Sequence, residues 1–330
     1  MEPMRFDGQV AVVTGAGRGL GNAYARLLAE RGARVVVNNR IRPGTEAQRP
    51  IADEVAEAIT RAGGLAVADT SDVGTTEGAQ AVVEAALATY GRLDIVVNNA
   101  GVVQFHSFPD YPDDEFERMV DVHLRGTWHV NRAAWPHLAA QGYGRIVNTV
   151  SRGAFFGDPR GAAYASCKGA ILGMTRALAV EGGQAGIAVN AISPTAWTPL
   201  YASAPDVSPE RRAELERDFR TEQVAPVLVL LAHSSCDFTG EVIAAAGSQV
   251  SRFFLGQTAG ASLGAEPTPE DVARALPDVW DETGYHPVGL VTPGQRARKT
   301  PRAEVPPSAR RSRAAGGGEA GLRAVGEQAE

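Results

Sequence analysis

The sequence predicts an α/β fold: one doubly wound, Rossmann-like sheet of about seven parallel strands, with helices on both faces. Short strand-like runs alternate with longer helical stretches, which is the pattern of βαβ units. Several of the short runs are nearly continuous Val, Ile and Ala, as strands covered on both faces require. Because this alternation fills most of the chain, we expect a single domain built on one sheet.

Each expected strand is a short apolar or β-branched run, and each expected helix is a longer stretch that follows it. The expected strands are Val10–Val13, Arg34–Asn38, Ala66–Asp69, Ile95–Asn98, Arg145–Thr149, Ala188–Ile192 and Glu241–Ala245. The expected helices are Leu20–Arg31, Ile51–Ala62, Thr76–Tyr90, Asp114–Ala140, Ala162–Gly182 and, in pieces, Ser208–Ala232.

Two segments interrupt this alternation. Arg40–Pro50 is a long polar loop after the second strand. Residues 296–330 are rich in Arg, Pro, Gly and Ala and contain almost no large apolar side chain, so we expect a disordered tail. Residues 1–295 then form the folded domain with a C-terminal extension. Within the extension, a Thr cap, an early Pro and first-turn acids predict a helix at Thr268–Ala275.

The composition excludes several classes of protein. The formal net charge of −6 argues against a dedicated nucleic-acid binder, which would present a basic face. The cysteines, Cys167 and Cys236, form neither a bridge framework nor a metal-ligand pattern, so we expect reduced thiols and no metal. The chain starts without a secretory signal pattern and has no apolar run of the roughly 20 residues that span a bilayer. We therefore expect a soluble, cytoplasmic protein with no membrane partner.

A glycine-rich turn follows the first strand and opens the first helix. Its pattern is TGxxxGxG, with Gly15, Gly19 and Gly21, and Arg18 and Leu20 lie between these glycines. Glycine permits a tight turn and close approach of the backbone to a pyrophosphate, whose charge then meets the helix N–H groups. Between a strand and a helix, the turn predicts a dinucleotide site rather than a purely structural turn.

The end of the second strand bears on which dinucleotide binds. NAD enzymes usually place an acid there to bind the ribose hydroxyls, but this strand ends Val37-Asn38-Asn39-Arg40. Asn39 would not repel a 2′-phosphate, and Arg40 and Arg18 could pair with it. NADP is therefore favoured over NAD. In the alternative, both arginines simply face solvent.

Tyr164 and Lys168 form a YxxxK motif, whose members share one face of a helix. Ser151 follows the fifth strand, at the carboxyl edge of the sheet where cofactor and substrate meet. Reduction of a carbonyl needs a proton donor, and a free tyrosine with a pKa near about 10 is a poor match at neutral pH. We expect the Lys168 ammonium to lower the pKa of Tyr164, and Ser151 to hold the carbonyl oxygen.

The glycine motif, the segment Asn98–Gly101, Ser151, Tyr164 and Lys168 together resemble the short-chain dehydrogenase/reductase family over about residues 5–250. The resemblance implies that Lys168 also binds the nicotinamide ribose, next to Tyr164, and that the enzyme is a homodimer or homotetramer built on the helices Asp114–Ala140 and Ala162–Gly182. It further implies cofactor contacts from Asp72, Val73, Asn99, Ala100, Gly101, Pro194 and Thr198.

A narrower resemblance points to the (3R)-hydroxyacyl-CoA dehydrogenase group of peroxisomal multifunctional enzymes type 2. It is carried by the segments Val122–Thr127, Arg132–His137, Tyr143–Ile146, Val224–Pro226 and Leu231–Cys236, and by the long loop after the second strand.

The sequence also departs from these patterns. His123 stands where the wider family has a relay asparagine, and it could pass protons or be a buried structural histidine. Asn39 replaces an acid of the narrower group, and Pro194-Thr195 replaces Pro-Gly, so the turn after the sixth strand must differ. Trp197–Arg220, which would cover the substrate, is unlike that of the group.

These observations predict an NAD(P)(H)-dependent oxidoreductase that interconverts a secondary alcohol and a ketone. The resemblance favours a 3-hydroxyacyl or 3-oxoacyl thioester, or a polyketide- or steroid-like ketone of similar bulk. The alternative is a catalytically silent dinucleotide sensor or a scaffold, which would not need Ser151, Tyr164 and Lys168 together.

Overall fold

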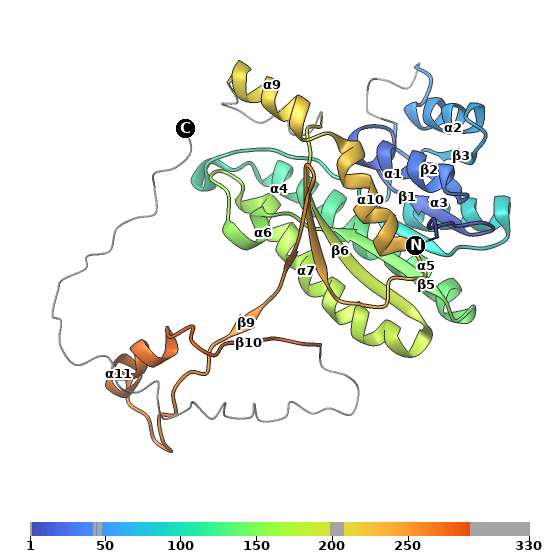
Figure 1. Ribbon diagram of the computed structural model, residues 1–330. Coiled ribbons are helices and arrows are strands. Elements are labelled where there is room, and N and C mark those ends of the chain that lie inside the picture. The colour runs from blue at the N-terminus through green and yellow to red at the C-terminus, as the bar shows by residue number, and fades with distance from the viewer. Residues whose placement is uncertain (1, 42–43, 45–47, 199–207, 291–330) are drawn as a thin grey trace. The chain divides into compact units, whose positions relative to one another are not determined.

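In the computed structural model, which describes residues 2–41, 44, 48–198 and 208–290, eight strands form one sheet (Figure 1). Their order across the sheet is β3-β2-β1-β4-β5-β6-β7-β8. The pairs are parallel except that β8 runs antiparallel to β7. The strands are β1 Val10–Val13, β2 Arg34–Asn38, β3 Leu65–Asp69, β4 Ile95–Asn98, β5 Gly144–Thr149, β6 Ile187–Thr195, β7 Val242–Ala246 and β8 Gln249–Phe253.

The chain reverses its direction of travel across the sheet at β1, which pairs with β2 on one side and β4 on the other. In sheets with such a reversal, ligands bind beyond the carboxyl ends of the strands. The predicted site residues follow these ends: the glycine turn after β1, Asn99 after β4 and Ser151 after β5.

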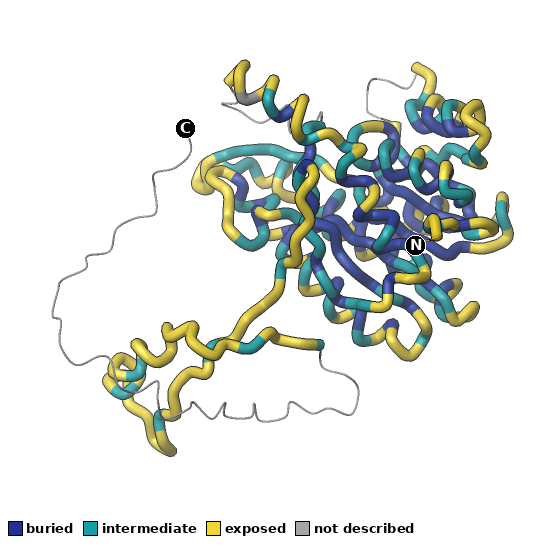
Figure 2. Tube along the Cα trace, in the orientation of Figure 1, coloured by how far each residue is buried: buried dark blue, intermediate teal, exposed yellow. Residues whose placement is uncertain are grey.

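Helices cover both faces of the sheet. They are α1 Gly19–Glu30, α2 Ile51–Arg61, α3 Thr76–Tyr90, α4 Asp113–Met119, α5 Gly126–Ala140, α6 Gly153–Phe156, α7 Ala162–Gly182, α9 Pro209–Asp218 and α10 Thr221–Ala232. Ala11 and Val13 of β1 pack in a core with α1, α2 and α10, whereas Val10 and Val12 pack with α3 and α5. Both faces of β1 are therefore buried, which explains its unbroken apolar sequence (Figure 2).

The sequence prediction and the structure agree on the doubly wound α/β fold and differ in several elements. β8 was not predicted, because it is an edge strand whose residues 249–252 are exposed and show no apolar run. The predicted helix Asp114–Ala140 is interrupted by a π-helical segment, Val120–Arg125, between α4 and α5. The short helix α6 was also missed, since its four residues are too few for a periodic pattern.

Residues 255–289 form a second unit. It contains the two-stranded pair β9 (Gly256–Gln257) and β10 (His286–Pro287) and the helix α11 (Pro269–Val279). Thr268 caps α11 by accepting a hydrogen bond from the Asp271 N–H, so the predicted helix at Thr268–Ala275 is confirmed. The predicted tail, residues 296–330, lies outside the described residues.

We expect Leu228→Ala to lower the free energy of unfolding by about 2–5 kcal/mol, the usual cost of a large cavity in a core. Leu228 lies on α10 and is fully buried against the sheet. Urea unfolding followed by circular dichroism measures the effect. Leu65→Ala is the matched control, because Leu65 is 55% exposed, and its effect should stay within about 1 kcal/mol. Equal losses in both variants would contradict the assignment of α10 to the core.

Candidate active site

The structure brings Ser151, Tyr164 and Lys168 together at the carboxyl end of β5. Tyr164 and Lys168 lie one turn apart on α7, and Ser151 follows the last residue of β5 by two positions. The Ser151 side chain lies close enough to the Tyr164 hydroxyl to lower its pKa. The Lys168 Nζ lies 5.6 Å from the centre of the Tyr164 ring. These three side chains therefore form one cluster, as the motif spacing predicts.

Lys168 is held by the end of β5. Its side chain is only 3% exposed, and its Nζ donates a 2.8 Å hydrogen bond to the carbonyl oxygen of Thr149. The Ser151 Oγ accepts a hydrogen bond of 3.2 Å from the Gly153 N–H at the start of α6. Backbone groups thus orient both side chains, so the cluster is arranged before any ligand arrives.

Burial acts on the two titratable members of the cluster in opposite directions. It lowers the pKa of Lys168 to about 7, because an ammonium loses solvation. The Tyr164 side chain is only partly covered, yet the protein around its hydroxyl raises its pKa, and the Ser151 side chain opposes this rise. The Tyr164 pKa is therefore raised in the chain alone, and not lowered as expected from Lys168, because desolvation is the largest effect on it.

His123 lies beside this cluster, in the π-helical segment. Its ring is 1% exposed and stands edge-on to the Tyr164 ring, with 5.3 Å between the centroids. Nε2 lies 2.6 Å from the Val102 carbonyl oxygen and 3.2 Å from the Val102 backbone nitrogen, so it faces both backbone groups of this residue. Nδ1 is buried and has no hydrogen-bond partner among the described residues. Burial lowers the His123 pKa to about 3, so the imidazole is neutral at physiological pH.

A buried amide network behind the cluster was not predicted from sequence. The Asn98 amide nitrogen donates to the side-chain oxygens of Asn131 at 2.7 Å and Asn148 at 2.9 Å. Asn148 in turn donates to the Thr175 hydroxyl on α7 at 3.0 Å. Asn98 and Asn148 are register partners on β4 and β5, so two asparagines at the ends of neighbouring strands were the available sequence signal. The network links both strands to α5 and to α7. Helix α7 is the one that carries Tyr164 and Lys168.

The glycine turn lies very close to the chain after β4. Gly15 has a φ of +63°, and a Cβ there would lie 2.7 Å from the Ala100 Cα. A Cβ on Gly21 would lie 2.4 Å from the Gly15 carbonyl oxygen. The N–H groups of Asn99 and Ala100 each donate 3.0 Å hydrogen bonds to the Thr14 hydroxyl. Only glycines fit this narrow cradle, which suits the backbone to a pyrophosphate.

The remaining loop positions surround this cradle. Gly19 also has a positive φ, +54°, and Leu20 lies in the first turn of α1. A Cβ on Gly101 would lie 2.7 Å from the His123 Cε1, so this glycine permits the close approach of His123. The segment Asn99–Gly101 therefore contacts the glycine turn on one side and His123 on the other.

Beyond β2, the predicted ribose and adenine contacts form a second group. The Asn39 Oδ1 accepts a hydrogen bond of 3.3 Å from the Gly17 N–H, so this side chain supports the glycine turn. Arg40 lies 3.4 Å from the Asp72 carboxylate in a partly exposed ion pair. Val73, next to Asp72, is buried. Arg18 is exposed and makes no ion pair with any described residue.

The turn expected to differ at Pro194 and Thr195 is replaced by a continuation of strand β6. β6 continues through both residues, which pair with Ala245 and Ala246 of β7. The departure from Pro-Gly therefore extends the strand where a turn was expected. Thr198 lies partly buried three residues later, and residues 199–207 of the predicted substrate cover lie outside the described residues.

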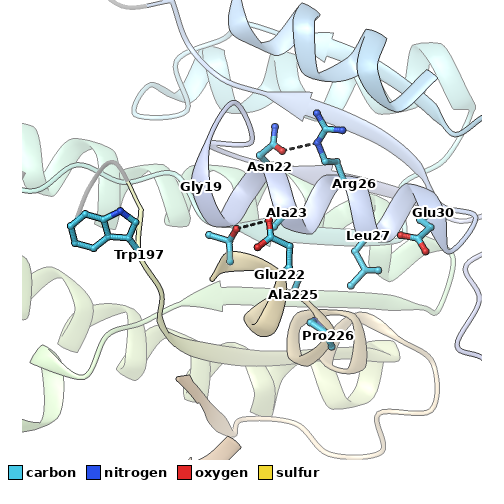
Figure 3. Close-up of a pocket in the computed structure, with 11 residues that line it drawn as sticks. Gly19, Asn22, Ala23, Arg26, Leu27, Glu30, Trp197, Glu222, Ala225 and Pro226 are labelled. Carbon is cyan, nitrogen blue, oxygen red and sulfur yellow. Dashed lines mark hydrogen bonds between the residues drawn. The ribbon is translucent and has the colours of Figure 1, made fainter. Parts of the chain in front are cut away.

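A hollow of about 540 Å³ lies between α1 and α10, near Trp197 (Figure 3). The backbone N–H of Trp197 donates a 2.6 Å hydrogen bond to the Phe219 carbonyl oxygen. The Arg212 guanidinium lies 5.3 Å from the centre of the Trp197 ring. The hollow meets the predicted site only at Gly19. It is lined by Gly19, Asn22, Ala23, Arg26, Leu27, Glu30, Trp197, Thr221, Glu222, Ala225 and Pro226.

Comparison with known proteins agrees with this geometry. The family profile described as short chain dehydrogenase matches residues 9–203. The chain is a short-chain dehydrogenase. This assignment confirms the resemblance seen in the glycine turn and the YxxxK motif.

Three relatives of this short-chain dehydrogenase are informative. Peroxisomal multifunctional enzyme type 2 of Mus musculus is 38% identical over 286 residues, which cover 85% of this chain and 37% of the mouse protein. A short-chain type dehydrogenase/reductase of Mycobacterium tuberculosis is 37% identical over 86% of this chain and 97% of its own. The full-length multifunctional enzyme type 2 of Drosophila melanogaster superposes with a TM-score of 0.73 at 32% identity, covering 87% of this chain and 48% of the fly chain.

The chain thus spans less than half of the length of the mouse and fly multifunctional enzymes type 2. Membership of the family supports an oxidoreductase that uses a dinucleotide and interconverts an alcohol and a ketone. The glycine cradle fits such a dinucleotide. Among the described residues, no helix is both long and apolar enough to cross a membrane. The cytoplasmic location stays a prediction, since the matching mouse protein is by its name peroxisomal.

We expect the acid sensitivity of this dehydrogenase to depend on His123. The pKa of His123 is 6.5 in the unfolded chain and about 3 in the folded chain, so only the unfolded chain binds this proton between these two pH values. Stability therefore rises with pH across this window and falls on acidification. Between about pH 6.5 and about pH 4.5 the loss due to His123 is about 2–3 kcal/mol.

His123→Gln should remove most of this loss. Urea unfolding at several pH values measures it. His137→Gln, a change at an exposed position of α5, should leave the pH slope unchanged. A wild-type slope in His123→Gln would show that another group causes the acid sensitivity.

Proposed function

We propose that this short-chain dehydrogenase uses NADP(H) to interconvert a 3-hydroxyacyl and a 3-oxoacyl thioester, or a polyketide- or steroid-like ketone of similar bulk. The observation that carries the catalytic part is the cluster of Ser151, Tyr164 and Lys168 at the carboxyl end of β5. The substrate class is supported by the similarity to multifunctional enzyme type 2 over 286 residues.

Tyr164 is the proposed proton donor. Its raised pKa keeps the phenol protonated at neutral pH, as an acid for ketone reduction must be. Ser151, whose side chain already acts on the Tyr164 hydroxyl, would hold the carbonyl oxygen beside that proton. Lys168, with a pKa of about 7, can exchange a proton near neutrality and would stabilise the phenolate left behind. When bound, the dinucleotide supplies or receives the hydride.

His123 is the proposed next member of the proton path. Its ring touches Tyr164, and its buried Nδ1 lacks a hydrogen-bond partner among the described residues. As a neutral imidazole, His123 would accept a hydrogen bond or a proton at Nδ1, on the buried side that has no partner among the described residues.

The residues proposed to hold the dinucleotide lie along the carboxyl edge of the sheet. The turn after β1 would hold the pyrophosphate, Asp72 and Val73 the adenine, and Lys168 the nicotinamide ribose. The full proposed set is Gly15, Arg18, Gly19, Leu20, Gly21, Asn39, Arg40, Asp72, Val73, Asn99, Ala100, Gly101, Tyr164, Lys168, Pro194 and Thr198. A silent sensor or scaffold remains a weaker proposal, since it needs no oriented proton donor.

NADP is favoured by the charges after β2. Asn39 carries no charge that would repel a 2′-phosphate, and its side chain already supports Gly17. Arg40 is partly exposed, and its 3.4 Å ion pair with Asp72 is long. Because surface ion pairs contribute little, Arg40 can turn to a phosphate at small cost.

A homodimer or homotetramer in the cytoplasm is also proposed. Two large apolar side chains are exposed on the helices expected to pair: Phe116 on α4 is 41% exposed and Trp128 on α5 is 50% exposed. Exposed apolar residues on one surface are typical of protein interfaces.

Tyr164→Phe should lower kcat by at least about a hundredfold, the lower end of the effect of general acid–base catalysis. The ring remains, so the Kd for the dinucleotide should stay within about twofold. Steady-state kinetics and fluorescence titration measure the two quantities. Tyr143→Phe makes the same chemical change at the opposite end of β5 and should retain activity. Retained turnover in Tyr164→Phe would remove Tyr164 from the mechanism.

For cofactor choice, we expect kcat/KM to favour NADP(H) by about ten- to a hundredfold, from charge-assisted hydrogen bonds reduced by solvent exposure. Asn39→Asp should shift the ratio towards NAD(H) by restoring the repelling carboxylate, and Arg40→Ala should reduce the preference. The measurement is kcat/KM with each nucleotide for wild type and both variants. A wild-type preference for NAD(H), or no shift in Asn39→Asp, would refute the charge argument.

A further inference from the structure

The connection between α6 and α7 places a carboxylate beside Ser151. A Cβ added to Gly153 would lie 2.4 Å from the Asp158 Oδ2 and 3.7 Å from the Ser151 Oγ. Both oxygens therefore border the same point in space, next to the serine proposed to hold the substrate carbonyl. The charge of Asp158 also reaches Tyr164, whose pKa it helps to raise.

The backbone fixes Asp158 in this place. The Gly161 N–H donates a 3.0 Å hydrogen bond to the Asp158 carbonyl oxygen, and a Cβ on Gly161 would lie 3.1 Å from the Asp158 Cβ. The connection bends through Gly157, with a φ of +71°, and Arg160, with a φ of +60°. Arg160 is the one non-glycine with a positive φ among the described residues, and a strained backbone of this kind is common at ligand sites.

The Asp158 carboxylate is not neutralised by the chain. Within the part of the chain that the structure describes, it makes neither an ion pair nor a side-chain hydrogen bond, and the residue is exposed. The neighbouring Arg152 places its guanidinium over the Phe156 ring, 5.5 Å from the ring centre. The Asp158 carboxylate therefore faces the solvent near Ser151 without a charged partner among the described residues.

We propose that Asp158 determines substrate specificity by excluding ketones that carry a negative charge near the reacting carbonyl. The enzyme then accepts an esterified or thioesterified 3-oxo acid and rejects the free acid. This inference rests on the proposed function for the identity of the reacting carbonyl. Because Asp158 lies close to Ser151, it would repel a carboxylate carried next to the reacting carbonyl of a free 3-oxo acid, whereas an ester has no charge there.

The expected size of the effect follows from exposure. Two charges about 6 Å apart at a partly solvated site repel each other enough to change affinity by about three- to tenfold. Added salt screens this repulsion, because the screening length falls from more than about 10 Å to a few ångströms as salt rises.

The test compares two ligands with the same ketone, methyl acetoacetate and acetoacetate. Their Kd values are measured by fluorescence titration with the oxidised dinucleotide bound, so that no turnover occurs. The wild type should bind the ester more tightly. Asp158→Asn should narrow the ratio of the two Kd values by about three- to tenfold. Asp237→Asn removes the same charge from an exposed position after α10 and should leave the ratio unchanged.

Salt gives a readout that does not depend on any variant. Raising KCl from about 0.05 M to about 0.5 M should bring the wild-type Kd values for acetoacetate and methyl acetoacetate closer together. The same change should barely alter the ratio of the two Kd values in Asp158→Asn. An Asp158→Asn ratio equal to that of wild type, or a wild-type ratio unaffected by salt, would overturn the inference. Turnover of the ester by the reduced dinucleotide is measured separately. Charge discrimination without turnover would support the role of Asp158 and contradict the proposed function.

Discussion

The burial of the Lys168 amine is the constraint on which the rest of the site depends. A buried amine needs a hydrogen-bond acceptor, and here the acceptor is the carbonyl oxygen of Thr149, the last residue of β5. This contact holds α7 against the end of the strand. Tyr164, one turn before Lys168, and Ser151, just after Thr149, are then brought together as a consequence. The asparagine network supports the same strand ends from within the core.

Desolvation explains the electrostatic character of the site. It disfavours the charged form of Lys168, Tyr164 and His123 alike. The pKa values of Lys168 and His123 are therefore lowered and that of Tyr164 is raised, so each neutral form is favoured. The free protein therefore holds a phenol and a neutral imidazole, with an amine close to its titration point. Approach of an anionic ligand would raise the Lys168 pKa, because an opposite charge favours the ammonium. Ligand binding and proton position are thus coupled through one buried residue.

Much of the fold and the main site residues could be predicted from the sequence. The strands β1 to β7 have apolar runs long enough to recognise, and glycine turns and the YxxxK motif depend on local spacing. β8 escaped prediction because an exposed edge strand carries no apolar run. The asparagine network and the contact of His123 with Val102 depend on residues distant in sequence, and the place of Asp158 depends on the backbone bend between α6 and α7. The direction of the Tyr164 pKa shift also required the structure, since burial cannot be read from a motif.

The π-helical segment Val120–Arg125 has a consequence for the tolerance of this chain to length changes. A π-helical turn contains one more residue than an α-helical turn. Deleting a single residue there would restore α-helical winding and rotate the preceding side chains by about 100° relative to α5. His123 would then leave Val102, and the space that Gly101 keeps open for it would be empty. The extra residue of the π-helical turn therefore sets the orientation of His123. Its imidazole faces Tyr164 only while this extra residue is present.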